Sequence, residues 1–188
     1  METVDLLLHP VRLRIVYALS GGRVRTTAEL CERLTDVPKT TVYRHVGLLA
    51  AGGVLEIAAE RRVRGAVERH YRLRRDRAAI DPEAGAAMSL EDHRQGFAAA
   101  MAALLAEFGA YLDRPGAEPY ADLVGYRQGI LWLSDEELAE AAGQVQAVLA
   151  ARAGNPATPE RRPRLLSLIQ FPTEEPPPSA GPVAGGRS

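Results

Sequence analysis

Residues 26–53, TTAELCERLTDVPKTTVYRHVGLLAAGG, decide the fold of this 188-residue chain. Thr26 and Glu29 have the spacing of a capping box, in which each side chain bonds the backbone amide of the other at the start of a helix. The helix that follows carries Leu30 and Leu34 on one face. It is expected to end before Pro38, because the residue preceding a proline is pushed out of helical geometry.

A second helix is predicted over residues 39–51. Val42, Val46 and Leu49 have the i, i+4, i+7 spacing of one buried stripe. The pair Gly52-Gly53 ends the helix, since glycine accepts the left-handed turn that closes it. Two short helices joined by a tight turn form a helix-turn-helix, whose second helix enters the major groove of DNA.

Two strand-like segments follow, at residues 54–59 and 66–73. One face of the second segment is predicted to hold Val67, Arg69, Tyr71 and Leu73. Between the segments lies a predicted hairpin tip, residues 60–65, whose cations are Arg61, Arg62 and Arg64. A basic hairpin directly after a recognition helix is a wing, placed to reach phosphates or the minor groove.

Three segments resemble the ArsR-like winged helix-turn-helix regulators in their order and spacing. They are HPVRLRI at residues 9–15, AELC at 28–31 and KTTVYRHVGLLAAGGVL at 39–55. The resemblance covers roughly residues 5–75, and it implies a dimeric bacterial transcriptional regulator, usually a repressor, that binds palindromic operator DNA. The rest of the chain looks closer to longer regulators with an added C-terminal domain than to the short metal sensors.

The outward face of the predicted recognition helix offers donors for reading DNA. Arg44 suits a bidentate contact to guanine, and Tyr43 and Thr41 offer hydroxyls and apolar edges to a thymine methyl. Lys39 and Thr40, at the helix N-terminus, suit phosphate. The predicted DNA-binding residues are Lys39, Thr40, Thr41, Tyr43, Arg44, His45, Arg61, Arg62 and Arg64. The alternative is an ordinary solvated helix face and turn.

The sequence does not decide the roles of His45 and of the two arginines Arg12 and Arg14. His45 stands where the family usually has His, and it either bonds a phosphate or braces the backbone. Arg12 and Arg14 belong to a supporting helix that begins at Pro10 and whose expected buried stripe is Val11, Ile15, Ala18 and Leu19. One of these arginines is a candidate for a phosphate contact.

Charge divides the chain at residue 76. Residues 1–76 hold 14 Lys and Arg against 9 Asp and Glu, a net charge of +5, whereas residues 77–188 hold 9 against 15, a net charge of −6. This asymmetry indicates a DNA-binding part joined to a part that stays off DNA. The single cysteine, the lack of a signal peptide and the lack of an apolar run of about 20 residues predict a cytoplasmic protein without a membrane span.

A long helix is predicted from a cap at Ser89 to about Asp113, with Asp92 as the acidic third residue. Its large apolar residues recur at intervals of 4, 3, 4 and 3, which form a heptad seam: Phe97, Met101, Leu104, Phe108 and Tyr111. Alanines around the seam would let another helix approach closely. The seam either dimerises the protein or packs on the chain's own C-terminal domain, and the resemblance favours dimerisation.

The C-terminal part is predicted to be a strand–helix–strand unit. The strands are expected at residues 123–133 and 164–171, and the helix follows a capping box at Ser134. The stripe of that helix is Leu138, Ala141, Val145, Val148 and Leu149. Because such a unit cannot bury both faces of its sheet, we expect it to pack on the long helix or on a partner subunit. Residues 172–188 are rich in proline and are expected to be disordered.

The expected fold class is therefore mainly α with a small β component (α+β). The predicted divisions are a winged helix-turn-helix domain at 1–76, a connector and long dimerisation helix at 77–116, a strand–helix–strand domain at 117–171 and a Pro/Gly-rich tail at 172–188.

Neither a metal, a cofactor nor a catalytic residue is expected. Soft-metal sites need several sulfurs or imidazoles, whereas Cys31 is the only cysteine and the four histidines lack ligand spacing. The sequence holds no Gly-rich phosphate loop, nucleophile elbow, HExxH pair or Cys/His dyad. The protein is therefore not expected to be an enzyme.

The predicted function is sequence-specific DNA binding by a homodimer that represses transcription from an inverted-repeat operator. Two alternatives stay open. The C-terminal domain either only completes the dimer or binds a small apolar effector in a pocket lined from Phe97, Phe108, Tyr111, Tyr126 and Trp132. In the second alternative, the winged helix makes protein–protein contacts in place of DNA contacts.

Overall fold

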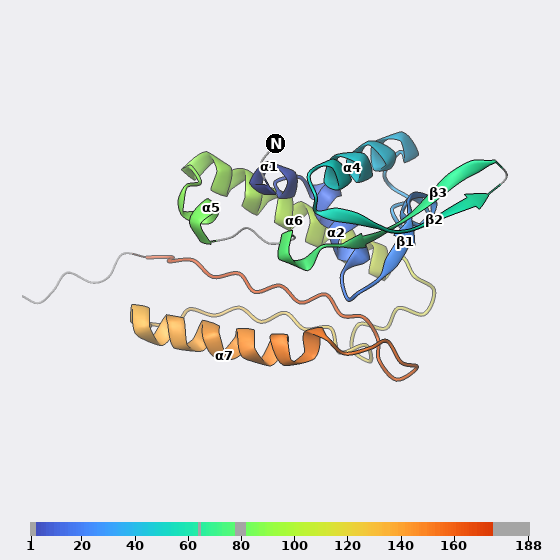
Figure 1. The fold of residues 1–188 in the computed structure, drawn as a ribbon. Coiled ribbons are helices and arrows are strands. Elements are labelled where there is room, and N and C mark those ends of the chain that lie inside the picture. The colour runs from blue at the N-terminus through green and yellow to red at the C-terminus, as the bar shows by residue number, and fades with distance from the viewer. Residues whose placement is uncertain (1–2, 64, 78–81, 175–188) are drawn as a thin grey trace, which may run out of the picture. The chain divides into compact units, whose positions relative to one another are not determined.

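The computed structural model describes residues 3–63, 65–77 and 82–174 (Figure 1). The chain divides into two compact units. Unit 1 comprises Met1–Val124 and Ala153–Asn155, and unit 2 comprises Gly125–Arg152 and Pro156–Ser188.

The helix-turn-helix of unit 1 forms as its caps predict. Helix α3 is Thr27–Arg33 and helix α4 is Lys39–Ala51. The capping box is complete, since the Thr26 side chain accepts from the Glu29 amide at 3.2 Å and the Thr26 amide donates to the Glu29 carboxylate at 2.7 Å. After α4 the chain turns through Gly53, whose φ of +74° lies in the left-handed region.

Two further helices complete the core of unit 1. Helix α1 is Thr3–Leu7, and α2 is Pro10–Leu19, whose N-cap His9 accepts from the Val11 amide. Of the predicted α2 stripe, Val11 is only half-buried, and Val16 joins the core instead. The helices meet around a set of fully buried side chains: Leu6, Ile15, Leu19, Leu30, Leu34, Val42, Val46, Leu49 and Val54.

The wing is a three-stranded antiparallel sheet of order β1-β3-β2, formed by β1 Val24–Thr26, β2 Leu55–Val63 and β3 Ala66–Leu73. Strand β1 was not predicted, because three residues are too few to show an alternation. Strand β2 continues to Val63, which pairs with Ala66, so the predicted tip at residues 60–65 is too long.

The four residues predicted to share one face of β3 lie on that strand but differ in burial. Tyr71 is buried and Leu73 is half-buried, but Val67 and Arg69 are exposed. The hairpin extends past the end of the helical core (Figure 1), and the described residues of its outer half are mostly exposed. The pairing also shifts register between Ile57 and Ala59.

Helix α6, Leu90–Leu112, confirms the predicted long helix and its capping box at Ser89 and Asp92. It follows the short helices η1 Arg75–Arg77 and α5 Pro82–Ala86. Its buried residues are Ala99 and Ala103, on the side that packs against α2. The small side chains that we expected to admit another helix therefore admit one of the chain's own.

By length and composition alone, α6 would be apolar enough to cross a membrane. Much of that apolar character comes from alanines. In unit 1, however, the helix packs on α2 and forms ion pairs through Glu107 with Arg14 of α2 and Arg33 of α3. These contacts are those of a helix in a globular domain.

Unit 2 corrects the prediction for the C-terminal part. Helix α7, Asp135–Ala153, forms with the predicted Ser134–Glu137 capping box. Neither predicted strand forms: residues 124–133 and 162–173 run as stretched chain in Figure 1 without strand pairing. None of the α7 residues is buried, and all five residues of the predicted stripe are exposed. The predicted disorder of the tail concerns residues 172–188, of which 175–188 lie outside the described residues.

Candidate nucleic-acid interface

Helix α4 presents a polar face on an apolar base. Val42, Val46 and Leu49 are buried and hold the helix on the core. Lys39, Thr40, Tyr43 and Arg44 are exposed together on the opposite face, and Thr41 is half-buried beside them. In the described part of the chain, the side chains of Lys39, Tyr43 and Arg44 make no hydrogen bond or ion pair. Their donors are therefore available to a ligand.

The sixth predicted contact on α4, His45, lies in the core with 2% of its surface exposed. Its ring lies against that of His9 in a tilted arrangement, with 4.3 Å between the ring centroids and 41° between the ring planes. Burial, followed by the nearby positive charges of His9, Arg44 and Arg12, lowers the pKa of His45 to about 4. A neutral, buried imidazole fits the bracing role and not a cationic phosphate contact.

Arg12 is a basic residue of this region whose surroundings the sequence could not show. Its side chain is buried at the start of α2, and its Nε lacks a hydrogen-bond partner among the described residues. Burial lowers the pKa of Arg12, the carboxylate of Asp5 raises it, and Arg44 lowers it again. Arg12 and Arg44 thus place positive charge where α2 meets the recognition helix.

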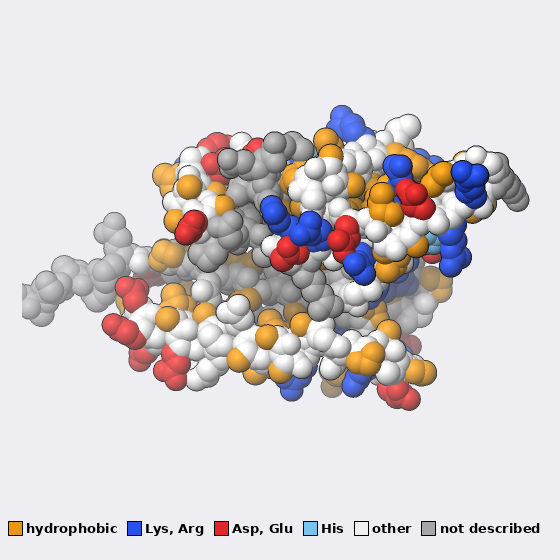
Figure 2. Space-filling view, in the orientation of Figure 1, with side chains coloured by type: hydrophobic (Ala, Val, Ile, Leu, Met, Phe, Trp, Pro, Cys, Tyr) orange, Lys and Arg blue, Asp and Glu red, His pale blue; other side chains and the backbone are white. Residues whose placement is uncertain are grey.

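The wing adds further cations (Figure 2). Arg61 and Arg62 are exposed on β2, opposite Glu68 and Val67 of β3, and not at the hairpin tip. Because successive residues of a strand point to opposite faces, the two arginines face opposite sides of the hairpin. Arg64 lies outside the described residues.

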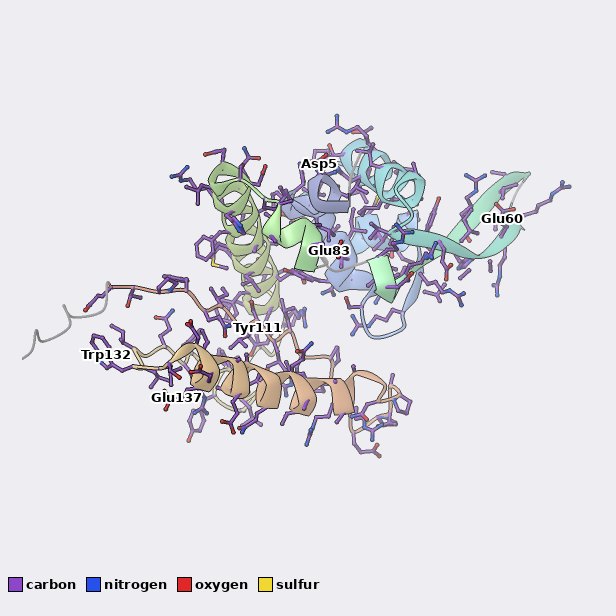
Figure 3. The ribbon with its side chains drawn as sticks, turned by 60° about the vertical axis from the view of Figure 1, so that its left-hand side comes forward. Asp5, Glu60, Glu83, Tyr111, Trp132 and Glu137 are labelled. Atoms are coloured by element: carbon purple, nitrogen blue, oxygen red, sulfur yellow. The ribbon has the colours of Figure 1, made fainter. Side chains whose placement is uncertain are left out.

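Two other wing arginines are already paired. Arg69 donates to Glu60 at 3.0 Å, and Arg72 donates to Glu56 across the β2–β3 pair. Figure 3 shows Glu60 on the projecting part of the hairpin. Arg61 and Arg62 have no ion pair among the described residues, which leaves them as the available cations of β2.

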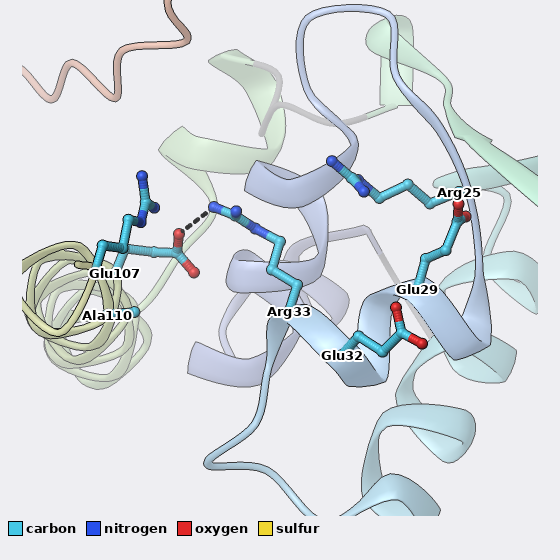
Figure 4. A pocket seen from close by; sticks show the side chains of 7 residues that line it. Arg25, Glu29, Glu32, Arg33, Glu107 and Ala110 are labelled. Carbon is cyan, nitrogen blue, oxygen red and sulfur yellow. Dashed lines mark hydrogen bonds and ion pairs between the residues drawn. The ribbon is translucent and has the colours of Figure 1, made fainter. Parts of the chain in front are cut away.

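An ion-pair network connects the helix-turn-helix to α6. Arg14, 4% exposed, donates to both oxygens of Asp36 in the α3–α4 turn, at 2.6 and 2.9 Å. Its Nε also contacts Glu107 of α6 at 3.4 Å, and Arg33 donates to the other Glu107 oxygen at 2.8 Å (Figure 4). The hydrogen bonds raise the pKa of Arg14 and lower that of Asp36. The network therefore orients the turn of the motif against α6.

A hollow of about 400 Å³ lies beside this network in unit 1. Figure 4 shows its charged lining, and the full set is Arg25, Glu29, Glu32, Arg33, Glu107, Ala110 and Arg114. None of the five aromatic residues predicted to line an apolar effector pocket belongs to it. Its lining holds three arginines and three glutamates, which balance in charge.

The predicted dimerisation seam lies along α6 away from its buried alanines. Phe97 is 50% exposed, and the remaining members are half-buried: Met101, Leu104, Phe108 and Tyr111. The Tyr111 hydroxyl donates to Asp122 at 2.8 Å, and its ring lies 5.9 Å from that of Phe108. The core of unit 1 thus leaves this seam partly uncovered.

Metal ligands do not come together in the part of the chain that the structure describes: no three His, Cys, Asp or Glu side chains there form a group that could hold an ion. Cys31 is a buried thiol of α3.

The comparison with known proteins concerns the part of the chain that carries the candidate interface. No curated protein matches the chain as a relative. Residues 7–58, which include α2, α3, α4 and the start of β2, match a family model described as a helix-turn-helix domain. This part of the chain is therefore a helix-turn-helix domain, the kind of domain with which regulators of transcription bind DNA.

Proposed function

We propose that the chain is a sequence-specific transcriptional regulator of the ArsR-like winged helix-turn-helix type, which binds an inverted-repeat operator as a homodimer and represses by occupying the promoter. The observation that carries the proposal is the exposed donor face of α4, held on the core by Val42, Val46 and Leu49. A helix anchored in this way presents its first turns to a major groove without losing buried surface.

Each part of the interface has a distinct task. Arg44 reads a guanine through two parallel hydrogen bonds, and Tyr43 contacts a neighbouring base edge. Lys39 and Thr40 hold phosphate at the N-terminus of α4. Arg61 or Arg62, whichever faces the duplex, adds a phosphate or minor-groove contact from the wing.

The homodimer is proposed to form through the partly exposed seam of α6. A two-fold axis through that contact would set two copies of α4 into successive major grooves about 34 Å apart, which is one turn of B-DNA. Such a complex covers both half-sites of an inverted repeat and blocks access of other proteins to the same DNA.

Fluorescence anisotropy on duplexes from the gene's own upstream region tests the proposal. For the native chain we expect tight binding whose logarithm falls linearly with log salt. Arg44→Ala should lose about 1–3 kcal/mol of discrimination against a changed guanine, since that discrimination comes from its bidentate contact. Arg94→Ala is the matched control, because Arg94 is an exposed arginine on α6 that pairs only weakly with Glu91.

Equal affinity of the native chain for operator and scrambled duplexes would overturn the proposed sequence readout. An absence of DNA binding, with retained α-helical folding, would instead assign the winged helix to protein contacts.

A further inference from the structure

The charged hollow of unit 1 is not used by the proposed DNA interface. It measures about 400 Å³ and is lined from β1, from α3 and from the C-terminal end of α6 (Figure 4). That volume lies within the range of roughly 300–1,000 Å³ that is typical of sites for small molecules. Because its lining is almost entirely charged, a molecule that fits it must be polar, unlike the apolar effector that the sequence suggested.

Two of the three carboxylates in the lining are already committed to other groups. Glu29 completes the capping box of α3 and accepts from a backbone amide at 2.7 Å. Glu107 accepts from Arg33 at 2.8 Å and from Arg14 at 3.4 Å. The carboxylate of Glu32 makes no hydrogen bond or ion pair within the described chain, so it is the one uncommitted acid of this lining.

All three arginines of the lining keep donors for which the described residues provide no acceptor. The Nε of Arg33 is buried without a hydrogen-bond partner, since the contact to α6 is made by its Nη2. Arg25 uses its Nε on a carbonyl of α2 at 3.2 Å, which leaves its two Nη groups. Arg114 is exposed, and its guanidinium lies 5.8 Å from the centre of the Tyr111 ring. In Figure 4 the side chains of Arg25 and Arg33 extend toward one another.

Although the lining balances in formal charge, its uncommitted groups are mostly positive. A further cation lies nearby, since the pKa of Arg23 is lowered by burial and then by the charges of Arg25 and Arg33. A guanidinium group presents a planar fork of donors that matches the oxygens of a carboxylate or a phosphate. Because the three lining arginines come from different elements, a molecule with separate anionic groups contacts more than one of them at once.

We propose that this hollow binds a small organic anion with at least two carboxylate or phosphate groups, held by Arg25, Arg33 and Arg114. Glu32, in the same lining, repels the anion and lowers its affinity. Inorganic phosphate is too compact to contact arginines of three elements, so we expect it to bind more weakly. The site shares no residue with the donor face of α4 or the cations of β2, and binding of the anion does not depend on DNA.

The bound anion would act on the ion-pair network that reaches the α3–α4 turn. It competes with Glu107 for the guanidinium of Arg33, and Glu107 also contacts Arg14. Arg14 in turn holds Asp36, which lies in the turn before the recognition helix. We therefore expect the anion to lower the affinity for operator DNA, because the turn loses part of its support. This consequence rests on the proposed DNA binding, whereas the binding of the anion does not.

Isothermal titration calorimetry of the full chain with citrate tests the proposal, with sodium chloride holding the ionic strength constant. For the native chain we expect one saturable site with a Kd below about 1 mM, and binding of inorganic phosphate that is about 10-fold weaker. Arg114→Ala should weaken citrate binding about 10-fold, because it removes an exposed guanidinium without changing the core. Glu32→Gln should strengthen citrate binding, because it removes the uncommitted carboxylate.

Arg94→Ala and Glu91→Gln are the matched controls, since both residues are exposed on α6 and lie outside the lining. Both variants should bind citrate as the native chain does. An absence of saturable citrate binding, or equal affinities for citrate and inorganic phosphate, would overturn the proposal. It would also be overturned if Arg114→Ala lowered the affinity for duplex DNA and left citrate binding unchanged, because the arginine would then serve the duplex.

Anisotropy on the upstream duplex, with and without saturating citrate at one ionic strength, measures the coupling to DNA. We expect citrate to lower operator affinity in the native chain and to have less effect in Arg114→Ala. An unchanged operator affinity in the native chain would overturn the coupling. A chain that binds citrate but no duplex would overturn the proposed DNA binding and confirm the anion site.

Discussion

At the scale of the residue, the buried imidazole of His45 makes stability depend on pH. Its pKa of about 4 lies below the ordinary 6.5, so the unfolded chain binds a proton more readily than the folded one. The free energy of unfolding therefore has its full value above pH 6.5 and falls as the pH drops from 6.5 to about 4. His9, Arg12 and Arg44 face this ring and add to the effect.

Urea unfolding at pH 7.5 and 4.5 measures this dependence. We expect the native chain to lose roughly 1–2 kcal/mol more than His45→Gln across that interval, because glutamine does not titrate. His93→Gln, an exposed change on α6, should behave as the native chain does. Equal losses in the native chain and in His45→Gln would show that another group causes the pH dependence.

Glu107 is the second residue that we expect to contribute to the free energy of unfolding, because it is 9% exposed and accepts hydrogen bonds from both Arg14 and Arg33. Glu107→Ala leaves Arg14 with Asp36 alone, so we expect a loss of about 2 kcal/mol in the free energy of unfolding. Glu91→Ala removes an exposed pair on the same helix and should cost less than about 0.5 kcal/mol. Similar unfolding midpoints for the two variants would contradict the stabilising role of the network.

At the scale of the element, we expect the wing to contribute to the affinity for DNA but not to the preference among sequences. The double change Arg61→Ala and Arg62→Ala removes the cations of β2 that lack an ion pair among the described residues. We expect weaker binding to every duplex and a shallower salt dependence, by about one phosphate for the arginine that faces the DNA, with the preference among sequences retained. Salt titrations by anisotropy measure the slope.

The control for the wing is Arg69→Ala together with Glu60→Ala, which removes an existing pair without changing the net charge. This variant should keep the native salt slope. A changed sequence preference in the Arg61 and Arg62 variant would mean that the wing reads bases.

The helices of this protein were the elements that could be predicted. The capping boxes that begin at Thr26, Ser89 and Ser134 were all confirmed, because a cap is made by residues three apart in the sequence. The strands depended on neighbours distant in sequence. Strand β1 was missed for that reason, and the strands expected in unit 2 are absent from the described chain.

At the scale of the whole molecule, we expect the α6 seam to raise operator affinity by holding two copies together. Phe97→Asp should weaken dimerisation and lower operator affinity by more than 10-fold, because a monomer contacts only one half-site. Leu90→Asp is the control, since Leu90 is exposed at the start of the same helix, where an acid is well tolerated. Analytical ultracentrifugation and anisotropy on the same samples measure both quantities, and unchanged operator affinity would argue against the seam.

The nine predicted DNA contacts show how far a site could be predicted. Periodicity correctly turned Lys39, Tyr43 and Arg44 outward, because the buried stripe of one helix defines its free face. It could not place His45, whose burial depends on His9 and on the packing of α2 against α4. The length of β2, which moved Arg61 and Arg62 from the tip onto a strand, depended on pairing with β3.

The sequence by itself determined the helix-turn-helix, the long helix and their ends, since caps, glycines and 3.6-residue periodicity act over a few neighbouring residues. Only the tertiary structure decided that the alanines of α6 pack on α2, that Glu107 joins Arg14 of α2 to Arg33 of α3, and that no residue of α7 is buried. These outcomes depend on which surfaces meet across distant parts of the chain. Apolar patterning shows that a face must be buried, but it does not name the partner that buries it.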